Sequence, residues 1–182
     1  RGLRLMCLIE PSAVVETRRL VLRAPGSQDV ARLAAFANDP AIARMTLRMP
    51  HPYGVADAEE FVLKVAVQDP ARARTFLIEH EDHGPVGVIG LFEDGDPAPE
   101  VGYWIARPFW GRGLATEALQ GATAWAGRSW KRRALMAGHF SDNPASGRVL
   151  EKAGFLYTGE VRKGFSLARG AETETRRMVW LA

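Results

Sequence analysis

The sequence contains very little cysteine and histidine. Cys7 is the only cysteine among 182 residues, which excludes a disulfide framework or a thiolate metal cage within one chain. The four histidines include one closely spaced pair, His80 and His83, in a segment whose Asp, Gly and Pro are typical of a solvated turn. We therefore expect no metal site, and the single cysteine favours a reducing, cytoplasmic location.

Long apolar runs are also lacking. The chain begins with basic residues and a short apolar stretch, but Glu10 and Pro11 end that stretch well short of a signal-peptide core. No other segment approaches the length of a membrane span. Because the chain begins at Arg1 rather than at methionine, we expect residues 1–16 to be an N-terminal extension or a cloning remnant.

A strong excess of one charge is absent as well. The 24 basic and 21 acidic residues give a net charge of +3, which is too small to indicate a nucleic-acid partner. The hydrophobic content of 47% and charged content of 25% are typical of a globular protein with a real core. Residues 17–182 are therefore predicted to form one domain with no membrane association.

The pattern of apolar and turn-forming residues predicts an α/β domain. Alternation predicts strands at 17–24, 75–80, 86–92, 100–106, 134–140, 155–162 and 173–181. Helical spacing predicts helices starting near 27–29, 57, 114 and 143, a helical turn over 42–45, and a flexible hairpin over 164–170. Asp57 and Glu60 have the spacing of a capping box. Short turns indicate an antiparallel meander, and the helix from 114 crosses over to a parallel partner, so the sheet is mixed.

The most informative segment is a strand that breaks at two glycines and continues as a helix. Gly111 and Gly113 can adopt positive φ, and the helix from Leu114 presents unpaired N–H groups at the positive end of its dipole. The junction therefore suits a phosphorylated ligand, although an ordinary strand-to-helix turn has the same residues.

Three signatures in this order resemble the GCN5-related N-acetyltransferase superfamily, in particular its branch similar to bacterial ribosomal-protein N-terminal acetyltransferases. They are Thr17-Arg-Arg-Leu-Val-Leu-Arg23; Glu100-Val-Gly-Tyr-Trp104 running into Trp110-Gly-Arg-Gly-Leu-Ala-Thr-Glu-Ala118; and Asn143-Pro-Ala-Ser-Gly-Arg-Val-Leu-Glu-Lys-Ala-Gly-Phe155. The resemblance covers residues 17–181. It implies a mostly antiparallel twisted sheet, splayed at the cofactor site, with helices on both faces, and acetyl-CoA as co-substrate.

The resemblance also implies which residues bind acetyl-CoA. The pyrophosphate cradle is expected at Gly111, Arg112, Gly113, Leu114, Ala115 and Thr116. The superfamily's loop usually begins with Arg or Gln where Pro108 stands here, which removes that polar side chain, whereas the family's pyrophosphate contacts are mainly backbone N–H groups of the loop. Arg112, Arg148 and Lys152 are further candidates for phosphate contacts.

The strand before the loop is expected to pair with the pantetheine arm through its backbone. Ile105 and Ala106 are the predicted contacts in the resembling pattern. Gly102 and Pro108 weaken regular pairing and fit a splayed strand, although the strand could simply end at Pro108. The aromatic cluster of Tyr103, Trp104, Phe109 and Trp110 is interpreted as core or cleft wall.

Acetyl transfer to an amine needs a base, donors for the oxyanion and a proton for the thiolate. Glu100 is the candidate base, acting through a water, because it shares a strand face with Gly102; an ion-paired edge glutamate is the alternative. Asn143 and Ser146 match positions near the pantetheine and thiol, and both also suit a helix N-terminus. Ser146 is the first candidate for general acid and Tyr157 the second.

The sequence therefore predicts an acetyl-CoA-dependent N-acetyltransferase that acts on a primary amine, such as a protein N-terminus or a small molecule, by direct attack in a ternary complex. A noncatalytic acyl-CoA-binding or sensory domain is the alternative. A dinucleotide site is disfavoured because Arg132 and Arg133 stand where its acidic residue is expected, and a Walker lysine is missing. Family analogy suggests a homodimer.

Overall fold

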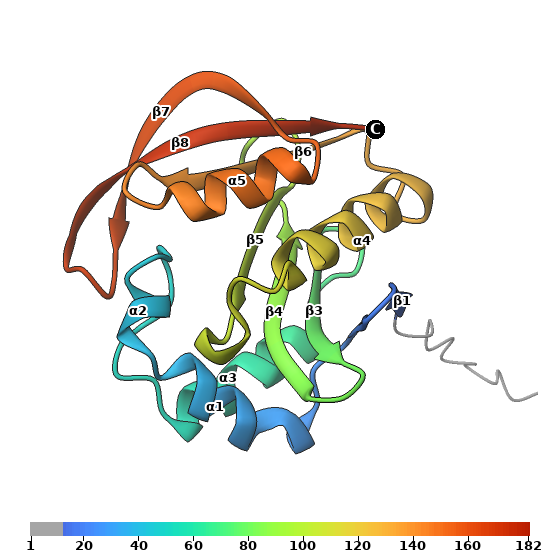
Figure 1. Ribbon diagram of the computed structural model, residues 1–182, viewed down its shortest axis with the longest axis vertical. Coiled ribbons are helices and arrows are strands. Elements are labelled where there is room, and N and C mark those ends of the chain that lie inside the picture. Colours follow the sequence, from blue (N-terminus) through green and yellow to red (C-terminus); the bar gives the residue numbers. More distant parts are fainter. Residues whose placement is uncertain (1–12) are drawn as a thin grey trace, which may run out of the picture.

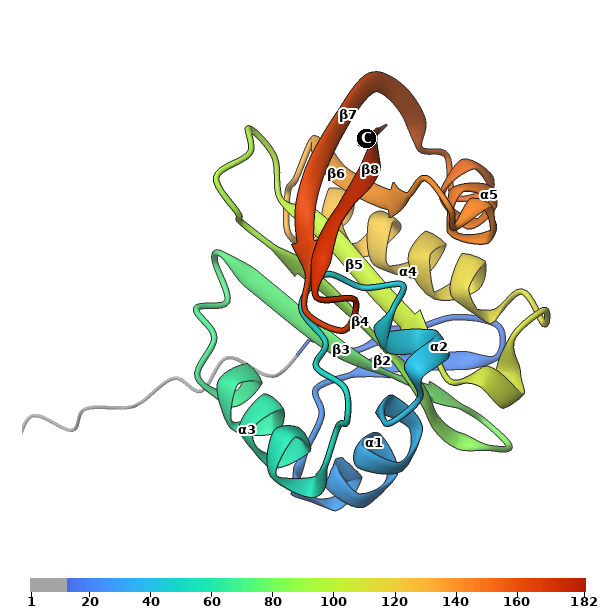
Figure 2. The same ribbon diagram turned by 90° about the vertical axis from the view of Figure 1, so that its left-hand side faces the viewer.

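The computed structural model describes residues 13–182, which form an eight-stranded mixed sheet with helices on both faces (Figure 1 and Figure 2). The strands are β1 (Val15–Glu16), β2 (Leu20–Arg23), β3 (Ala73–His80), β4 (Gly84–Phe92), β5 (Glu100–Ile105), β6 (Ala134–Phe140), β7 (Leu156–Ser166) and β8 (Ala171–Leu181). The helices are α1 (Val30–Ala37), α2 (Pro40–Ala43), α3 (Val55–Ala66), α4 (Leu114–Arg128) and α5 (Pro144–Lys152), with 3-10 turns η1 (Ser27–Asp29) and η2 (Arg107–Phe109). The predicted fold class is confirmed.

The sheet has the order β1-β2-β3-β4-β5-β6-β8-β7, and β5–β6 is its parallel pair. The crossover helix α4 connects these two strands, as the spacing of the sequence predicted. The remaining neighbours pair antiparallel, because short turns connect most of them. The meander and the parallel crossover were therefore both readable from the sequence.

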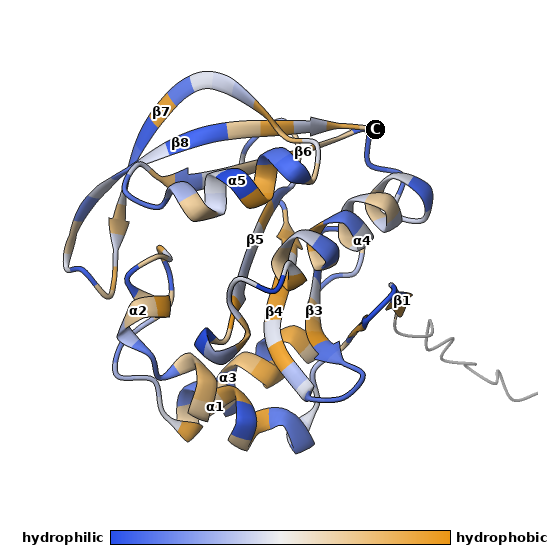
Figure 3. Ribbon diagram, viewed as in Figure 1, coloured by the Kyte–Doolittle hydropathy of each residue, from blue (hydrophilic) through white to orange (hydrophobic). Residues whose placement is uncertain are grey.

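Apolar side chains fill both faces of the sheet. One core lies under α4 and includes Phe76, whose ring meets Trp125 edge-on at 5.2 Å between centroids. The other lies under α1 and α3 and includes Leu33 and Val88. Figure 3 shows the hydrophobic residues concentrated in β3 and β4 at the centre of the sheet. Burying a side chain of this size contributes about 2 kcal/mol to folding, so the central strands form a firm base for the site.

The C-terminal hairpin differs from its prediction. A flexible segment was expected over 164–170, but β7 and β8 extend on both sides of a turn at 167–170. Gly164 pairs with Thr173 inside the ladder, and its missing side chain makes room for Leu47, which would lie 2.9 Å from a Cβ at position 164. The hairpin is fixed to the segment after α2, since the Leu167 N–H donates to the Leu47 carbonyl at 3.0 Å.

Two further details of the chain path also differ from expectation. The N-cap of α3 is Gly54, and the Asp57 carboxylate accepts the Gly54 N–H at 2.7 Å, so Asp57 stands at the third helical position and does not start a box with Glu60. Glycine can serve as the N-cap because the carboxylate three residues later satisfies its N–H. The strand predicted over 17–24 forms only at β2, Leu20–Arg23, and the short strand β1 precedes it at Val15–Glu16.

None of the helices among residues 13–182 is long and apolar enough to cross a membrane. The same residues contain no group of three or more His, Cys, Asp or Glu side chains placed to hold a metal ion. Cys7 lies outside the described residues.

Candidate active site

The parallel strands β5 and β6 separate almost as soon as they pair. Their register covers two residue pairs, Glu100 with Met136 and Val101 with Ala137, and the Met136 N–H donates to the Pro99 carbonyl at 2.8 Å. Beyond these pairs β5 continues to Ile105 along β4, while β6 continues along β8. The predicted splay therefore lies at the carboxyl ends of both strands, which is where ligands bind in open α/β sheets.

A cavity of about 590 Å³ extends from the splay to the start of α4 and is bounded by α5 and the segment after α2. Eight of the predicted cofactor-binding residues line it: Ile105, Gly111, Gly113, Leu114, Ala115, Thr116, Asn143 and Ser146. Arg148 and Lys152 of α5 also line it and place two cations near the loop. We call this space the loop cavity.

The glycine loop has the geometry of an anion cradle. Gly111 and Gly113 adopt φ of +74° and +75°, a region that costs other residues free energy. In the described part of the chain, no hydrogen bond is made by any backbone N–H from Gly111 to Thr116. Gly113 is the N-cap of α4, so the positive end of the helix dipole faces the same space. Unpaired donors and this dipole together favour a phosphate group.

Two predicted cofactor contacts lie differently from the rest. Ala106 is fully buried, and its N–H donates to the Val86 carbonyl at 2.8 Å, so that donor already has a partner. The Arg112 guanidinium lies over the Phe109 ring, 5.5 Å from its centroid. Neither residue lines the loop cavity. A contact from either one to a cofactor stays a prediction.

A second cavity of about 710 Å³ lies on the opposite side of the splay, between α3, β4, β5 and the β7–β8 hairpin. Glu100 and Gly102 of β5 line it, as do aromatic side chains including Tyr53 and Phe61. We call it the hairpin cavity. The two cavities share Met45, Thr46, Tyr103, Trp104 and Ser146, so they meet at the splay.

Tyr103 and Ser146 stand at this junction. The Tyr103 hydroxyl lies 2.9 Å from Ser146 Oγ and within 3.4 Å of the Ser146 carbonyl. Burial raises the pKa of Tyr103 to about 12, although its hydrogen bond with Ser146 acts to lower the pKa, so the phenol keeps its proton at neutral pH. Asn143 Oδ1 accepts the Ser146 N–H at 3.2 Å, so Asn143 is the N-cap of α5.

The comparisons with known proteins match this architecture. The family model described as "Acetyltransferase (GNAT) domain" matches residues 19–156. The chain belongs to this family. GNAT proteins are acetyl-CoA-dependent N-acetyltransferases, so the predicted activity class is confirmed.

Among curated relatives, the uncharacterized N-acetyltransferase YoaA of Bacillus subtilis is 28% identical over 162 residues, covering 82% of this chain and 86% of its own. The ribosomal-protein-serine acetyltransferase of Escherichia coli is 32% identical over 89 residues, 48% of this chain and 49% of its own. The structure of Mycobacterium smegmatis RimJ in complex with CoA-disulfide superimposes with a TM-score of 0.83 at 20% identity, covering 94% of this chain and 88% of RimJ. The predicted branch is thereby supported.

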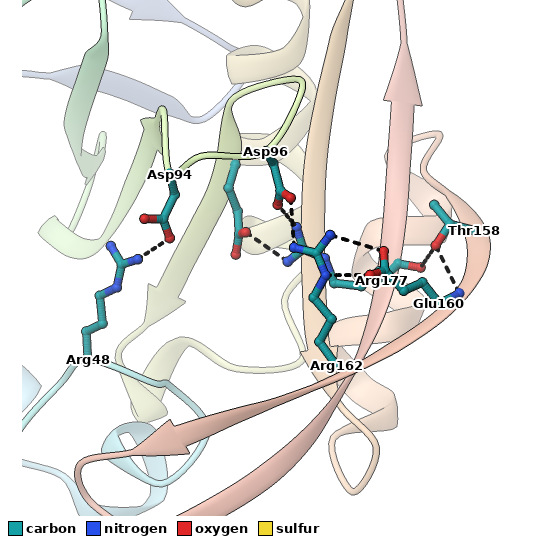
Figure 4. Close-up of polar contacts among 8 residues, drawn as sticks. Arg48, Asp94, Asp96, Thr158, Glu160, Arg162 and Arg177 are labelled. Atoms are coloured by element: carbon teal, nitrogen blue, oxygen red, sulfur yellow. Dashed lines mark hydrogen bonds and ion pairs between the residues drawn. The ribbon is translucent and has the colours of Figure 1, made fainter.

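The candidate base of this GNAT domain is part of a charge network at the rim of the hairpin cavity. Arg177, which is 4% exposed, donates from Nη1 to Glu100 Oε2 at 2.8 Å and from Nη2 to Asp96. Arg162 donates to the same Asp96 at 2.7 Å and to Glu160 at 2.6 Å, and Figure 4 shows Arg177 and Arg162 converging on Asp96. The ion-paired alternative for Glu100 is thus present, and its Oε1 has no partner among the described residues.

Every acidic side chain that lines the hairpin cavity has a hydrogen-bonding partner. Asp57 accepts the Gly54 N–H, Glu60 pairs with Lys64 and Asp94 pairs with Arg48, while Asp96 and Glu100 belong to the network above. Figure 4 shows the Arg48–Asp94 pair beside that network. The cavity therefore presents a balanced charge and mostly apolar walls, with no surplus of unpaired carboxylates.

Tyr157, the second candidate for general acid, lies behind α5. Its hydroxyl is 2.9 Å from Nε2 of the buried His139, whose Nδ1 is 2.8 Å from the Phe140 carbonyl. Neither cavity is lined by Tyr157. Gly147 makes room for the pair, because a Cβ there would lie 2.8 Å from the Tyr157 hydroxyl and 2.9 Å from His139 Nε2.

Sequence reasoning missed the hydrogen bond of Tyr103 with Ser146, although it placed Tyr103 correctly in the core or the cleft wall. Tyr103 was interpreted with Trp104, Phe109 and Trp110 as core or cleft wall, since a cluster of aromatic residues usually packs. One signal distinguished it: Tyr103 is the one hydroxyl-bearing side chain in the strand between Glu100 and the glycine loop. A buried phenol needs a hydrogen-bond partner, and that partner is Ser146.

Proposed function

We propose that this GNAT domain transfers the acetyl group of acetyl-CoA directly to a primary amine, with both substrates bound together. The observation that carries the proposal is the meeting of two cavities at Tyr103 and Ser146. One cavity contains the unpaired loop donors that suit a pyrophosphate, and the other has a carboxylate at its rim. A direct attack needs this arrangement, with donor and acceptor entering from opposite sides of one reaction point.

In this proposal the loop cavity binds acetyl-CoA. The N–H groups of Gly111 to Thr116 hold the pyrophosphate, with the Thr116 hydroxyl as a further donor, while Arg148 and Lys152 meet the remaining phosphate charge. The pantetheine arm lies along the free edge of β5 near Ile105. The thioester then reaches the junction of the cavities, next to Ser146.

The reaction forms one N–C bond and breaks one C–S bond. The amine nitrogen attacks the acetyl carbonyl carbon, and the amine proton passes through a water to Glu100, whose Oε1 is free and whose Oε2 is oriented by Arg177. The thiolate of CoA leaves and accepts a proton from Ser146 Oγ, and the proton that Glu100 received returns through water to the serine oxygen, so both side chains regain their starting states. The Tyr103 hydroxyl lies 2.9 Å from Ser146 Oγ, and when Tyr103 is the donor of this hydrogen bond the serine proton is left to point toward the sulfur.

The hairpin cavity takes the amine. Its carboxylates are already paired, so it offers little attraction to a polyamine with several positive charges. Apolar and aromatic walls beside one partly free carboxylate suit a molecule with a single amine, such as the N-terminus of a polypeptide or an amino-acid derivative. We assign the acceptor to this class.

The test measures acetyl-CoA binding by calorimetry and thiol release with a panel of peptides, amino-acid amides and polyamines. We expect single-amine acceptors to be turned over, and Glu100→Gln to keep acetyl-CoA affinity while lowering turnover more than about tenfold. Glu172→Gln, at an exposed carboxylate on β8 that lines neither cavity, is the matched control and should change neither value. Undiminished turnover in Glu100→Gln would remove Glu100 from the mechanism, and a failure to bind acetyl-CoA would end the proposal.

A further inference from the structure

The glycine loop is fastened from outside by a residue that lies almost a hundred positions earlier in the chain. Arg19, just before β2, donates from Nη2 to the carbonyl of Arg112 at 3.2 Å, and Arg112 stands between the two loop glycines. The same guanidinium donates from Nε to Glu117 Oε2 at 2.8 Å, in the first turn of α4. One side chain therefore holds both the loop and the helix that follows it.

The bond to the Arg112 carbonyl also determines the direction of a neighbouring donor. In a planar trans peptide the C=O and the following N–H point in opposite directions. Because Arg19 holds the Arg112 oxygen on one side of the loop, the Gly113 N–H points to the other side. Gly113 lines the loop cavity, and its N–H has no partner among the described residues. Arg19 thus orients the Gly113 N–H toward the loop cavity, although Arg19 itself does not line that cavity.

The second bond concerns charge. Glu117 stands in the first turn of α4, next to the glycine loop. Its negative charge would therefore repel a pyrophosphate bound at that loop. Its Oε1 accepts the Thr17 hydroxyl at 2.8 Å and the Arg19 N–H at 2.7 Å, and its side chain is only 15% exposed. Burial would raise the pKa of Glu117, but these hydrogen bonds and Arg19 hold it below its ordinary value. The carboxylate stays ionised, and the Arg19 guanidinium neutralises it.

We propose that Arg19 is a positioning residue for the CoA pyrophosphate: it orients the Gly113 N–H through the Arg112 carbonyl and cancels the charge of Glu117. The inference rests on the proposed function, because the pyrophosphate is the ligand that the loop would hold. It gives the opening signature Thr17-Arg-Arg19 a part in coenzyme binding from outside the cavity. Arg19 itself lines neither cavity.

The experiment compares two acetyl donors. Acetyl-CoA contains the pyrophosphate, and S-acetylpantetheine lacks it but carries the same thioester. For Arg19→Met we expect the Kd of CoA and the KM of acetyl-CoA to rise about tenfold, with kcat at saturation changed less than about twofold. The kcat/KM for S-acetylpantetheine should equal that of the wild type, because this donor does not use the loop.

Arg18→Met is the matched control, since Arg18 is an exposed neighbour with no hydrogen bond or ion pair in the described chain. It should behave as wild type with both donors. Arg19→Lys serves if the methionine variant folds poorly, because a lysine can pair with Glu117 but cannot bond Arg112 and Glu117 in the same fork geometry. We expect it to lose part of the CoA affinity.

The outcomes separate the two proposals. If wild-type protein binds no CoA, the proposed function itself fails. If it binds CoA and both Arg19 variants bind equally well, only the role of Arg19 is refuted. An equal loss with CoA and S-acetylpantetheine also refutes that role, because it would show a general effect on folding.

Discussion

The Tyr103 hydroxyl lies where the two cavities meet, and in the proposed mechanism its hydrogen bond with Ser146 Oγ orients the proton that the thiolate accepts. In Tyr103→Phe, Ser146 loses its partner and its own proton is no longer directed to the sulfur. We expect kcat to fall about tenfold with unchanged CoA affinity, measured by thiol release and calorimetry. Because burial raises the pKa of this phenol to about 12, Tyr103 does not titrate near neutral pH. The pH dependence of kcat in Tyr103→Phe should therefore have the same shape as in the wild type up to mildly alkaline pH. Tyr157→Phe should keep its turnover; a larger loss in that variant would transfer the acid role to Tyr157.

Single residues were predictable where their type restricts the backbone. Gly111 and Gly113 were expected at positive φ because other residues avoid it, and both adopt it. The partners of Ser146 and Glu100 were not predictable, because Tyr103 and Arg177 lie 43 and 77 positions away and only the folded sheet brings them together. A side chain's contacts depend on tertiary distances that local spacing does not encode.

At the scale of elements, the junction between β5 and α4 combines two residues at positive φ with direct access to the loop cavity. In Gly111→Ala, the methyl group meets no atom within 4 Å but is forced into positive φ, as it is in Gly84→Ala at the start of β4. Both variants should lose about 1 kcal/mol of unfolding free energy, measured by urea denaturation. Only Gly111→Ala should also lose CoA affinity, because its methyl group enters the loop cavity. Equal CoA affinity in both variants would contradict the cradle.

Helices and strands with a clear spacing of apolar residues were predicted well. Elements whose extent depends on contacts with a distant segment were not. The strand at 134–140 matches β6, because its apolar run is bounded by charged and polar residues. The hairpin over 164–170 was wrong in its extent, since Gly164 was interpreted as a source of flexibility, whereas it makes room for Leu47. The need for that space arises from the segment after α2, which no local pattern in β7 reveals.

At the scale of the whole molecule, stability should depend on pH through buried carboxylates. Asp29 is 3% exposed; burial alone would raise its pKa, but hydrogen bonds from Arg23 and the Gly26 N–H hold it below the ordinary 3.8. A carboxyl with a lowered folded pKa contributes stability above its unfolded pKa, and this contribution is lost as the pH falls through the folded value. Asp29→Asn should therefore lower the unfolding free energy by roughly 2 kcal/mol at pH 7 and by progressively less below pH 4.

Thermal unfolding followed across pH 7 to 2 checks this prediction. Asp82→Asn, at an exposed turn position whose carboxylate makes no hydrogen bond in the described chain, is the control and should follow the wild type throughout. A constant difference between wild type and Asp29→Asn at every pH would show that the carboxyl contributes by packing alone.

The short contact between β5 and β6 has a mechanical consequence. Strands β1 to β5 are joined by antiparallel ladders, and so are β6, β8 and β7, but the two groups meet through only two residue pairs in the sheet described here. Such a joint resists separation at Glu100 and Val101, and farther along the angle between the groups is held by side-chain contacts such as Tyr103 with Ser146 and no longer by the backbone ladder. A coenzyme lying in the wedge would act as a spacer that sets this angle. The width of the acceptor's entrance would then depend on the presence of the donor.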